Sequence, residues 1–228
     1  MRKVVTCLAV ILFLAGLGVF LYPWITEVIS DIEADRAIAK FQMIAEEEDE
    51  FSKLYEAMQE YNQEIYKNRQ SGLSDQLSYQ TPSFDLTKWG LEDNVVGYIT
   101  IPKMEVELPI YLGASEENMK HGAVHLSQTS LPIGGNNTNC VIAAHRGYRG
   151  APFFREIQRL EEGDEVFITN LWETLVYEVE HTEVIMPDES DKIMIQEGRE
   201  LVTLTTCHPY TENTYRYIVY AKRKSTNP

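Results

Sequence analysis

The sequence predicts an all-β fold with peripheral helices: a closed eight-stranded β-barrel preceded by a membrane helix and a helical stalk. Three observations support this fold class. Residues 4–22 carry no charge, helical periodicity then runs without Gly or Pro to residue 71, and β-rich segments separated by turn residues follow. The predicted domains are a cytoplasmic tip and transmembrane anchor at 1–23, a helical stalk at 24–72 and the barrel domain at 73–228.

The apolar stretch at residues 4–22 is long enough to cross a membrane. At ~1.5 Å per residue, a helix of this length spans roughly 28 Å, about the thickness of the hydrocarbon core. A cleaved signal peptide is the alternative, but Pro23 and Trp24 stand where a small-residue cleavage site would follow. Arg2 and Lys3 precede the span and acidic residues follow it. We therefore expect a single-pass protein of the cell membrane, with its N-terminus cytoplasmic and the barrel outside.

The predicted stalk is one helix, or two helices with a break near the acidic run at residues 46–50. We interpret that run as a solvated helix face rather than a cation site. The apolar positions of the second half should pack on the domain that follows, and Gly72 should end the helical stretch. These apolar positions include Leu54, Met58, Tyr61 and Ile65.

The segments beyond Gly72 are rich in Val, Ile, Tyr and Thr, as strands are. One short helix, Pro152 to Leu160, is expected among them. Because helical crossovers are scarce, the pattern favours a closed or nearly closed barrel over a parallel sheet. The predicted strands are 95–101, 106–111, 140–145, 164–170, 174–186, 200–207 and 215–223.

Composition excludes some classes of partner and scaffold. The 20 basic and 35 acidic side chains leave a net charge of -15, which repels phosphate backbones, so no nucleic acid is expected as a partner. Three cysteines are too few for a scaffold held together by disulfides, so a packed core must supply the stability.

Three reactive side chains are expected at one rim of the barrel. Cys207 closes a predicted strand, and Arg216 lies early in the next strand after a turn, so a hairpin would bring the two together. His145 also ends a predicted strand. A thiol, an imidazole and a guanidinium suit acyl transfer: the thiolate attacks a carbonyl, the imidazole protonates the leaving amine, and the guanidinium stabilises the oxyanion.

Other assignments of these residues remain open. Cys140 begins a buried-looking strand and is expected to be core packing, although outside the cell it could pair with Cys207 in a disulfide. A zinc site built from Cys140, His145, Cys207 and His208 is disfavoured because no Cys-x₂₋₄-Cys spacing is present, so we expect neither metal nor cofactor.

Two rival functions also fit the residues. The chain could be a non-catalytic, membrane-tethered interaction module with a structural Cys207. It could also be a cysteine protease of the Cys-His-Asn type, with Asn213 as the group that orients His145. The order of His before Cys argues against papain-like enzymes, in which Cys comes first.

The segments around these residues resemble one family. TLTTC at 203–207, followed by HPYTENTYR ending at Arg216, is similar to the sortase active-site signature. AAHRG at 143–147, with FFREIQRLEEGDEV downstream, resembles the region of the sortase catalytic histidine. The resemblance covers about residues 95–223. It implies a membrane-anchored cysteine transpeptidase of a Gram-positive surface with an eight-stranded barrel.

The resemblance also implies a role for each matching residue. Cys207 would be the nucleophile, His145 the general acid and base, and Arg216 the group that stabilises the substrate carbonyl and the oxyanion. Thr206 would contact substrate beside the cysteine. The enzyme would cleave an LPXTG-like sorting signal of a pilin or surface protein between Thr and Gly, and hold the acyl group as a thioester.

The combination of HRG with TC-x-PY-x-x-N-x-x-R is most similar to class C sortases, which polymerise pilins. The amine acceptor would then be a pilin lysine; for a housekeeping sortase it would be a cell-wall precursor amine. Residues 73–94 lack the Asp-Pro-aromatic lid of that class, and the chain lacks its second membrane span. We therefore expect a single anchor and an openly accessible Cys207, unless Phe84 or Trp89 forms a lid of different sequence.

Overall fold

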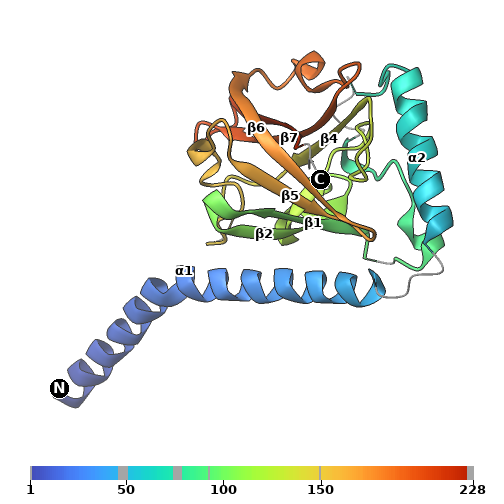
Figure 1. The fold of residues 1–228 in the computed structure, drawn as a ribbon. Coiled ribbons are helices and arrows are strands. Elements are labelled where there is room, and N and C mark those ends of the chain that lie inside the picture. The colour runs from blue at the N-terminus through green and yellow to red at the C-terminus, as the bar shows by residue number, and fades with distance from the viewer. Residues whose placement is uncertain (1, 46–50, 74–78, 92, 149, 225–228) are drawn as a thin grey trace.

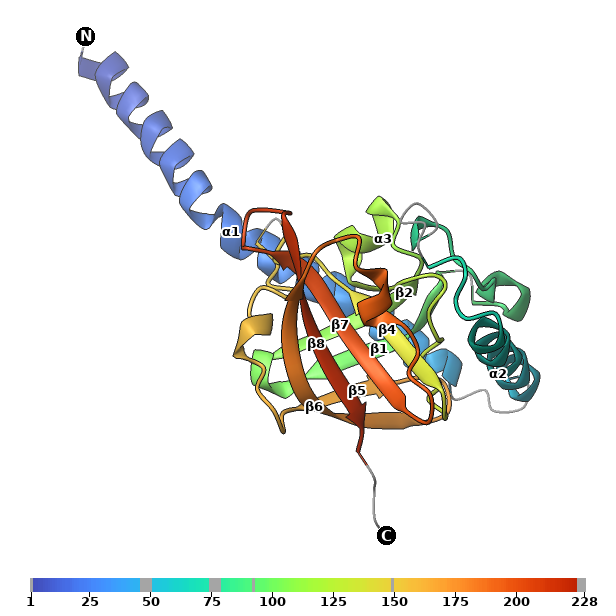
Figure 2. The same cartoon turned by 90° about the horizontal axis from the view of Figure 1, so that it is seen from above.

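Eight strands close into a barrel in the order β1-β2-β3-β4-β7-β8-β6-β5, which confirms the predicted fold class (Figures 1 and 2). The structure is a computed structural model that describes residues 2–45, 51–73, 79–91, 93–148 and 150–224. The strands are β1 (Val95–Ile101), β2 (Val106–Leu112), β3 (Ala123–His125), β4 (Thr138–Ala143), β5 (Glu165–Thr169), β6 (Thr174–Ile185), β7 (Glu200–His208) and β8 (Tyr215–Arg223).

Helix α1 (Arg2–Ala45) runs through the boundary between the predicted anchor and the predicted stalk. Its first part projects away from the barrel and its second part lies alongside β1 and β2, with a bend between them (Figure 1). Pro23 lies inside the helix, and proline bends a helix because it removes one backbone hydrogen bond. In the described part of the chain, α1 is the one helix long and apolar enough to cross a membrane.

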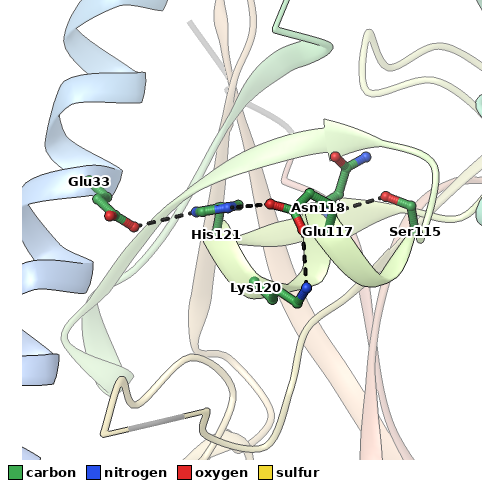
Figure 3. A network of polar contacts seen from close by, with 6 residues as sticks. All are labelled: Glu33, Ser115, Glu117, Asn118, Lys120 and His121. Atoms are coloured by element: carbon green, nitrogen blue, oxygen red, sulfur yellow. Dashed lines mark hydrogen bonds and ion pairs between the residues drawn. The ribbon is translucent and has the colours of Figure 1, made fainter.

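The predicted stalk is helical, and both of its helices lie against the barrel. Ala34, Ile38 and Phe41 of α1 are buried. Figure 3 shows a second contact of α1: His121 of α3 (Glu116–His121) lies between Glu33 of α1 and Glu117 of its own helix, with nitrogen–oxygen distances of 3.4 and 3.2 Å. The two helices of the predicted stalk therefore form a layer packed on the barrel.

Helix α2 (Ser52–Lys67) buries Leu54, Met58 and Ile65, as the apolar stripe predicted. It ends five residues before Gly72, so the predicted end was too late. The acidic run at 46–50 lies outside the described residues, and its interpretation stays a prediction.

Two local features differ from the sequence-based expectations. Strand β3 was missed because three residues are too few to show a strand period; α3 provides its connection to the parallel neighbour β2. The expected helix from Pro152 to Leu160 is a run of turns that ends in a single 3₁₀ turn, Ile157–Arg159. Phe153 has φ +41°, which a right-handed helix cannot accommodate.

The sheet formed by β4, β7, β8 and β6 has apolar side chains on both faces. One set, which includes Cys140, Leu204 and Val219, belongs to the main core. The other set packs under Ile193 of the short helix η5 (Ser190–Ile193), in the connection from β6 to β7. This second cluster forms the floor beneath the candidate site; it consists of Leu73, Leu126, Val141, Ile185, Ile193, Ile218 and Tyr220.

Candidate active site

Cys207 and Arg216 are direct partners across the antiparallel ladder of β7 and β8. Cys207 is a half-buried free cysteine near the end of β7. Arg216 is also half-buried, and its Nη1 donates to the carbonyl oxygens of Asn213 (3.1 Å) and Tyr215 (3.0 Å). The ladder thus places a thiol beside a guanidinium, as the predicted hairpin required.

His145 reaches the same rim from a neighbouring strand. β4 pairs in parallel with β7 up to Ala143, and the backbone N–H of Ala144 donates to the carbonyl of Thr205 at 3.3 Å. His145 follows directly and lies two residues beyond the end of β4, whereas the sequence predicted it as the last residue of the strand. Its ring stacks on Tyr148 with centroids 5.0 Å apart. Burial lowers the pKa of His145, which favours the neutral form of its imidazole.

Thr206, which directly precedes Cys207 on β7, contacts the segment that carries His145. Its side chain is buried, and its hydroxyl donates to the carbonyl of Ala144 at 2.7 Å. Because side chains alternate along a strand, Thr206 and Cys207 point to opposite faces of β7. The hydroxyl therefore connects the cysteine strand to the residue before His145.

His145, Cys207 and Arg216 line one pocket of about 340 Å³. Thr206 also lines it, and most of the remaining lining is apolar, which suits an extended peptide with small and aliphatic side chains. The other lining residues are Tyr79, Gln80, Ala114, Met119, Leu126, Ala143, Ala144, Ile185, Pro187, Glu189, Ser190, Ile193, Thr205 and Ile218.

The segment expected to lack a lid contributes to this pocket. Tyr79 and Gln80 line it, and the carbonyl of Tyr79 accepts a hydrogen bond from the N–H of Ala114 at 2.6 Å. Neither of the two aromatic side chains considered as plugs lines it: Phe84 packs edge-on against Tyr61, and Trp89 packs on the main core. Residues 74–78 lie outside the described residues, so the accessibility of Cys207 stays a prediction.

Cys140 is a member of the main core, which agrees with its interpretation as packing. It pairs with Val202 in the parallel ladder, five residues before Cys207 on the same strand. This separation is roughly 16 Å at ~3.3 Å per residue, whereas a disulfide needs Cα atoms within about 7 Å. The alternative disulfide is therefore excluded. Within the described ranges, no cluster of three metal-ligating side chains occurs.

The sequence analysis missed several residues at this rim. Arg146 is buried, and it contacts His208 and the carbonyl of Cys207. The HRG triplet was noticed only as part of the family resemblance, and no local pattern reports a partner 62 residues away. The pocket-lining residues of the β6–β7 connection, Pro187, Glu189, Ser190 and Ile193, were missed for the same reason.

The fold and this site define a class: closed β-barrels with a cysteine, a histidine and an arginine at one rim. A family model described as "Sortase domain" matches residues 99–224, more than half of the chain. The chain therefore belongs to the sortase family, a family of cysteine transpeptidases, as its sequence motifs predicted.

Relatives and solved structures agree with this assignment. The chain is 31% identical to sortase D of Bacillus subtilis over 56% of its own length and 63% of that protein's length. Among solved structures, "Sortase C1 of GBS Pilus Island 1" has a TM-score of 0.76 at 29% identity, covering 86% of this chain and 100% of the other. Clostridium perfringens sortase C solved with the C-terminal cell wall sorting motif has a TM-score of 0.72 at 32% identity, covering 84% and 100%. The predicted likeness to class C is thus confirmed.

Proposed function

We propose that the protein is a membrane-anchored cysteine transpeptidase that cleaves an LPXTG-like sorting signal and transfers the acyl group to a pilin lysine. The observation that carries this proposal is the cross-strand pairing of Cys207 with Arg216 in a pocket that also holds His145. Membership of the sortase family and the class C structural neighbours support it further.

In the first half of the reaction, neutral His145 accepts the proton of the Cys207 thiol. The thiolate attacks the carbonyl carbon of the scissile Thr–Gly bond, and the Arg216 guanidinium donates to the oxygen as it becomes negative. Collapse breaks the C–N bond, and the imidazolium of His145 gives its proton to the leaving amine. The product is a thioester on Cys207.

In the second half, an amine attacks the thioester carbon. His145 takes a proton from the attacking nitrogen and returns it to the departing Cys207 sulfur, which restores the free enzyme and leaves a new amide bond. The thioester keeps the acyl group reactive until the amine arrives, which an ester or free acid would do less well. The apolar lining of the pocket would keep water away from this intermediate.

The acceptor distinguishes the two candidate functions. Solved neighbours from GBS pilus island 1 and from Clostridium perfringens are named sortase C, which favours a pilin lysine. Several curated relatives are named sortase A, which leaves a cell-wall precursor amine as the alternative. The test is to incubate the full chain with a sorting-signal peptide and equal amounts of a lysine-bearing pilin and a precursor amine, and to weigh the products. Predominant pilin conjugate supports the proposal; predominant precursor conjugate replaces it with the housekeeping function.

A non-catalytic interaction module would form neither product. Alkylation of Cys207 should then leave the properties of the protein unchanged, whereas for a transpeptidase it should stop all peptide transfer.

The same proposal includes anchoring through residues 4–22, with the N-terminus in the cytoplasm. The apolar first part of α1 and the basic pair before it support this orientation. Protease added outside cell-wall-free cells should degrade the barrel and spare the N-terminal tip. Protection of the barrel from the added protease would contradict the proposed orientation.

A further inference from the structure

The residues on both sides of His145 are hydrogen-bonded to the residues on both sides of Cys207. On one side, the Thr206 hydroxyl donates to the carbonyl of Ala144 at 2.7 Å. On the other side, Nη1 of Arg146 donates to Nδ1 of His208 at 2.8 Å and to the carbonyl of Cys207 at 3.4 Å. Two contacts therefore connect the segments that carry the imidazole and the thiol.

Arg146 is an unusual residue for this place. Only 8% of it is exposed, and within the described residues its Nε has no hydrogen-bond partner. In the described part of the chain, its hydrogen-bond partners include no carboxylate: they are the His208 ring, the Cys207 carbonyl, and the side-chain oxygen of Gln158, which accepts from Nη2. Burying a guanidinium without a carboxylate is unfavourable. Groups that the surrounding structure holds at such a cost cluster at functional sites.

We propose that Arg146 is a positioning residue that, together with Thr206, holds His145 at a fixed distance and orientation relative to Cys207. This inference rests on the proposed function for its consequence in catalysis. A single contact would act as a hinge, whereas contacts before and after His145 restrict both translation and rotation of its segment. Proton transfer between thiol and imidazole requires hydrogen-bond geometry, so loss of this restraint slows the chemical step.

The clamp depends on the shape of arginine and on its partner at His208. A guanidinium presents several N–H groups in a fixed plane, so it can reach Gln158 on one side and His208 on the other; a lysine ammonium is a compact charge that lacks this fork. Because Nδ1 of His208 accepts from Arg146, its ring proton is on Nε2. R146K keeps the positive charge and loses the planar fork, so the charge and the geometry of Arg146 can be tested separately.

The first experiment compares R146K and R146M with the wild type, using the full chain in detergent and a sorting-signal peptide. The clamp predicts that kcat falls roughly tenfold to a hundredfold in both variants, while KM changes less than about twofold because the pocket lining is intact. R155K is the matched control: Arg155 is in the same loop, and its hydrogen bonds within the described residues go to the carbonyls of Gly150 and Ala151, so kcat should stay within about twofold. Wild-type kcat in R146K, or a change confined to KM, would overturn the clamp.

A second pair of variants covers the case in which Arg146 variants fold poorly. His208 is half-exposed, so its substitution should leave the fold intact. H208N keeps an acceptor near the Nδ1 position, and H208L removes it. The clamp predicts that kcat of H208L falls by about tenfold and that H208N retains most of the wild-type value. Equal kcat values for the two variants would overturn it.

The pH dependence of Cys207 alkylation separates this inference from the proposed function, because it needs no peptide substrate. Peptide mapping after treatment with iodoacetamide reports Cys207 alone. A thiol coupled to His145 should show a break in rate at the pKa of His145, and R146K should remove that break. A break that persists in R146K, or one absent from the wild type, would overturn the clamp. A break that R146K removes, in a wild type that cleaves no sorting signal, would leave the clamp standing and overturn the function.

Discussion

The protein contains two pairs of a cysteine and a histidine in different surroundings. One pair is buried on β3 and β4, and the other lies at the rim of the pocket. Cys140 and His125, the buried pair, are almost fully enclosed; Cys207 and His145, the rim pair, are half-buried. Burial raises the pKa of the Cys140 thiol far above its usual range and lowers the pKa of His125 to about 4. The buried pair is therefore held in its neutral, unreactive forms.

The difference between the pairs is their position along the strands. β4 and β7 run in parallel, and Cys140 lies in the third position of β4, whereas Cys207 lies near the end of β7, where the chain leaves the barrel. Nε2 of His125 donates to the carbonyl of Ser130 in the β3–β4 connection. The ring of His145, in contrast, lines the pocket and stacks on Tyr148. Residue type supplies the reactive group, and strand position decides whether substrate can reach it.

The largest expected effect separates the two cysteines. Cys207→Ala should abolish peptide transfer and cost only roughly 1 kcal/mol of stability, because it removes one sulfur at a rim. Cys140→Ala should keep transfer, since the thiol only packs in the core. Product mass and thermal unfolding measure both quantities. Transfer by a folded Cys207→Ala protein would remove the distinction between buried and rim cysteines.

The next effect concerns the guanidinium opposite Cys207. Arg216→Lys should lower kcat by about 10²-fold, the scale of losing one oxyanion donor, because an ammonium cannot reproduce a planar donor pair. Arg199→Lys is the control, since Arg199 forms an ion pair with Glu180 away from the pocket. Single-turnover kinetics with a sorting-signal peptide check the prediction. Turnover near wild type for Arg216→Lys would assign that residue a structural role.

The buried histidine should influence stability and not catalysis. The imidazole has a pKa of about 6.5 in the unfolded chain and about 4 in the folded chain, so below pH 6.5 the unfolded state binds more protons. Stability should therefore fall by about 3 kcal/mol as the pH drops from about 6.5 to about 4. Denaturant unfolding of the wild type and of His125→Asn should differ by this slope. Parallel curves would show that His125 is not held neutral.

The smallest effect compares two buried threonines of β7. Thr203 and Thr206 each donate one side-chain hydrogen bond, at 2.8 and 2.7 Å, to Asn139 and to the Ala144 carbonyl. Thr203→Val and Thr206→Val should each cost about 1–2 kcal/mol of stability. Only Thr206→Val should lower kcat, by a few-fold, because its partner precedes His145. A rise in KM alone would instead favour the predicted substrate contact by Thr206.

Much of the barrel was predictable because its strands are long and rich in β-branched and aromatic residues. β7 and β8 were placed within a residue, and the hairpin between them followed from the turn after Cys207. β3 could not be found because three residues carry no period, and the 152–160 segment looked helical because sequence patterns do not report the positive φ of Phe153.

The meeting of Cys207, Arg216 and His145 at one rim was predictable because each lies at or close to the end of a strand that the sequence pattern indicates. The clamp at Arg146 was not, because it depends on the parallel pairing of β4 with β7, strands separated by 56 residues of chain. The packing of the predicted stalk on the barrel was only partly predicted: the apolar stripe of α2 was expected to pack on the following domain, whereas the contact of α1 with β1 and β2 was not expected.

The measurement that tests the central claim most directly is the intact mass of a trapped acyl-enzyme. The full chain is mixed with a sorting-signal peptide in the absence of amine, quenched in acid, weighed and mapped. The account predicts one acyl adduct on Cys207, which disappears when a pilin lysine is added and reappears as a pilin conjugate. Peptide cleavage without an adduct on Cys207, or an adduct on Cys140, would contradict it.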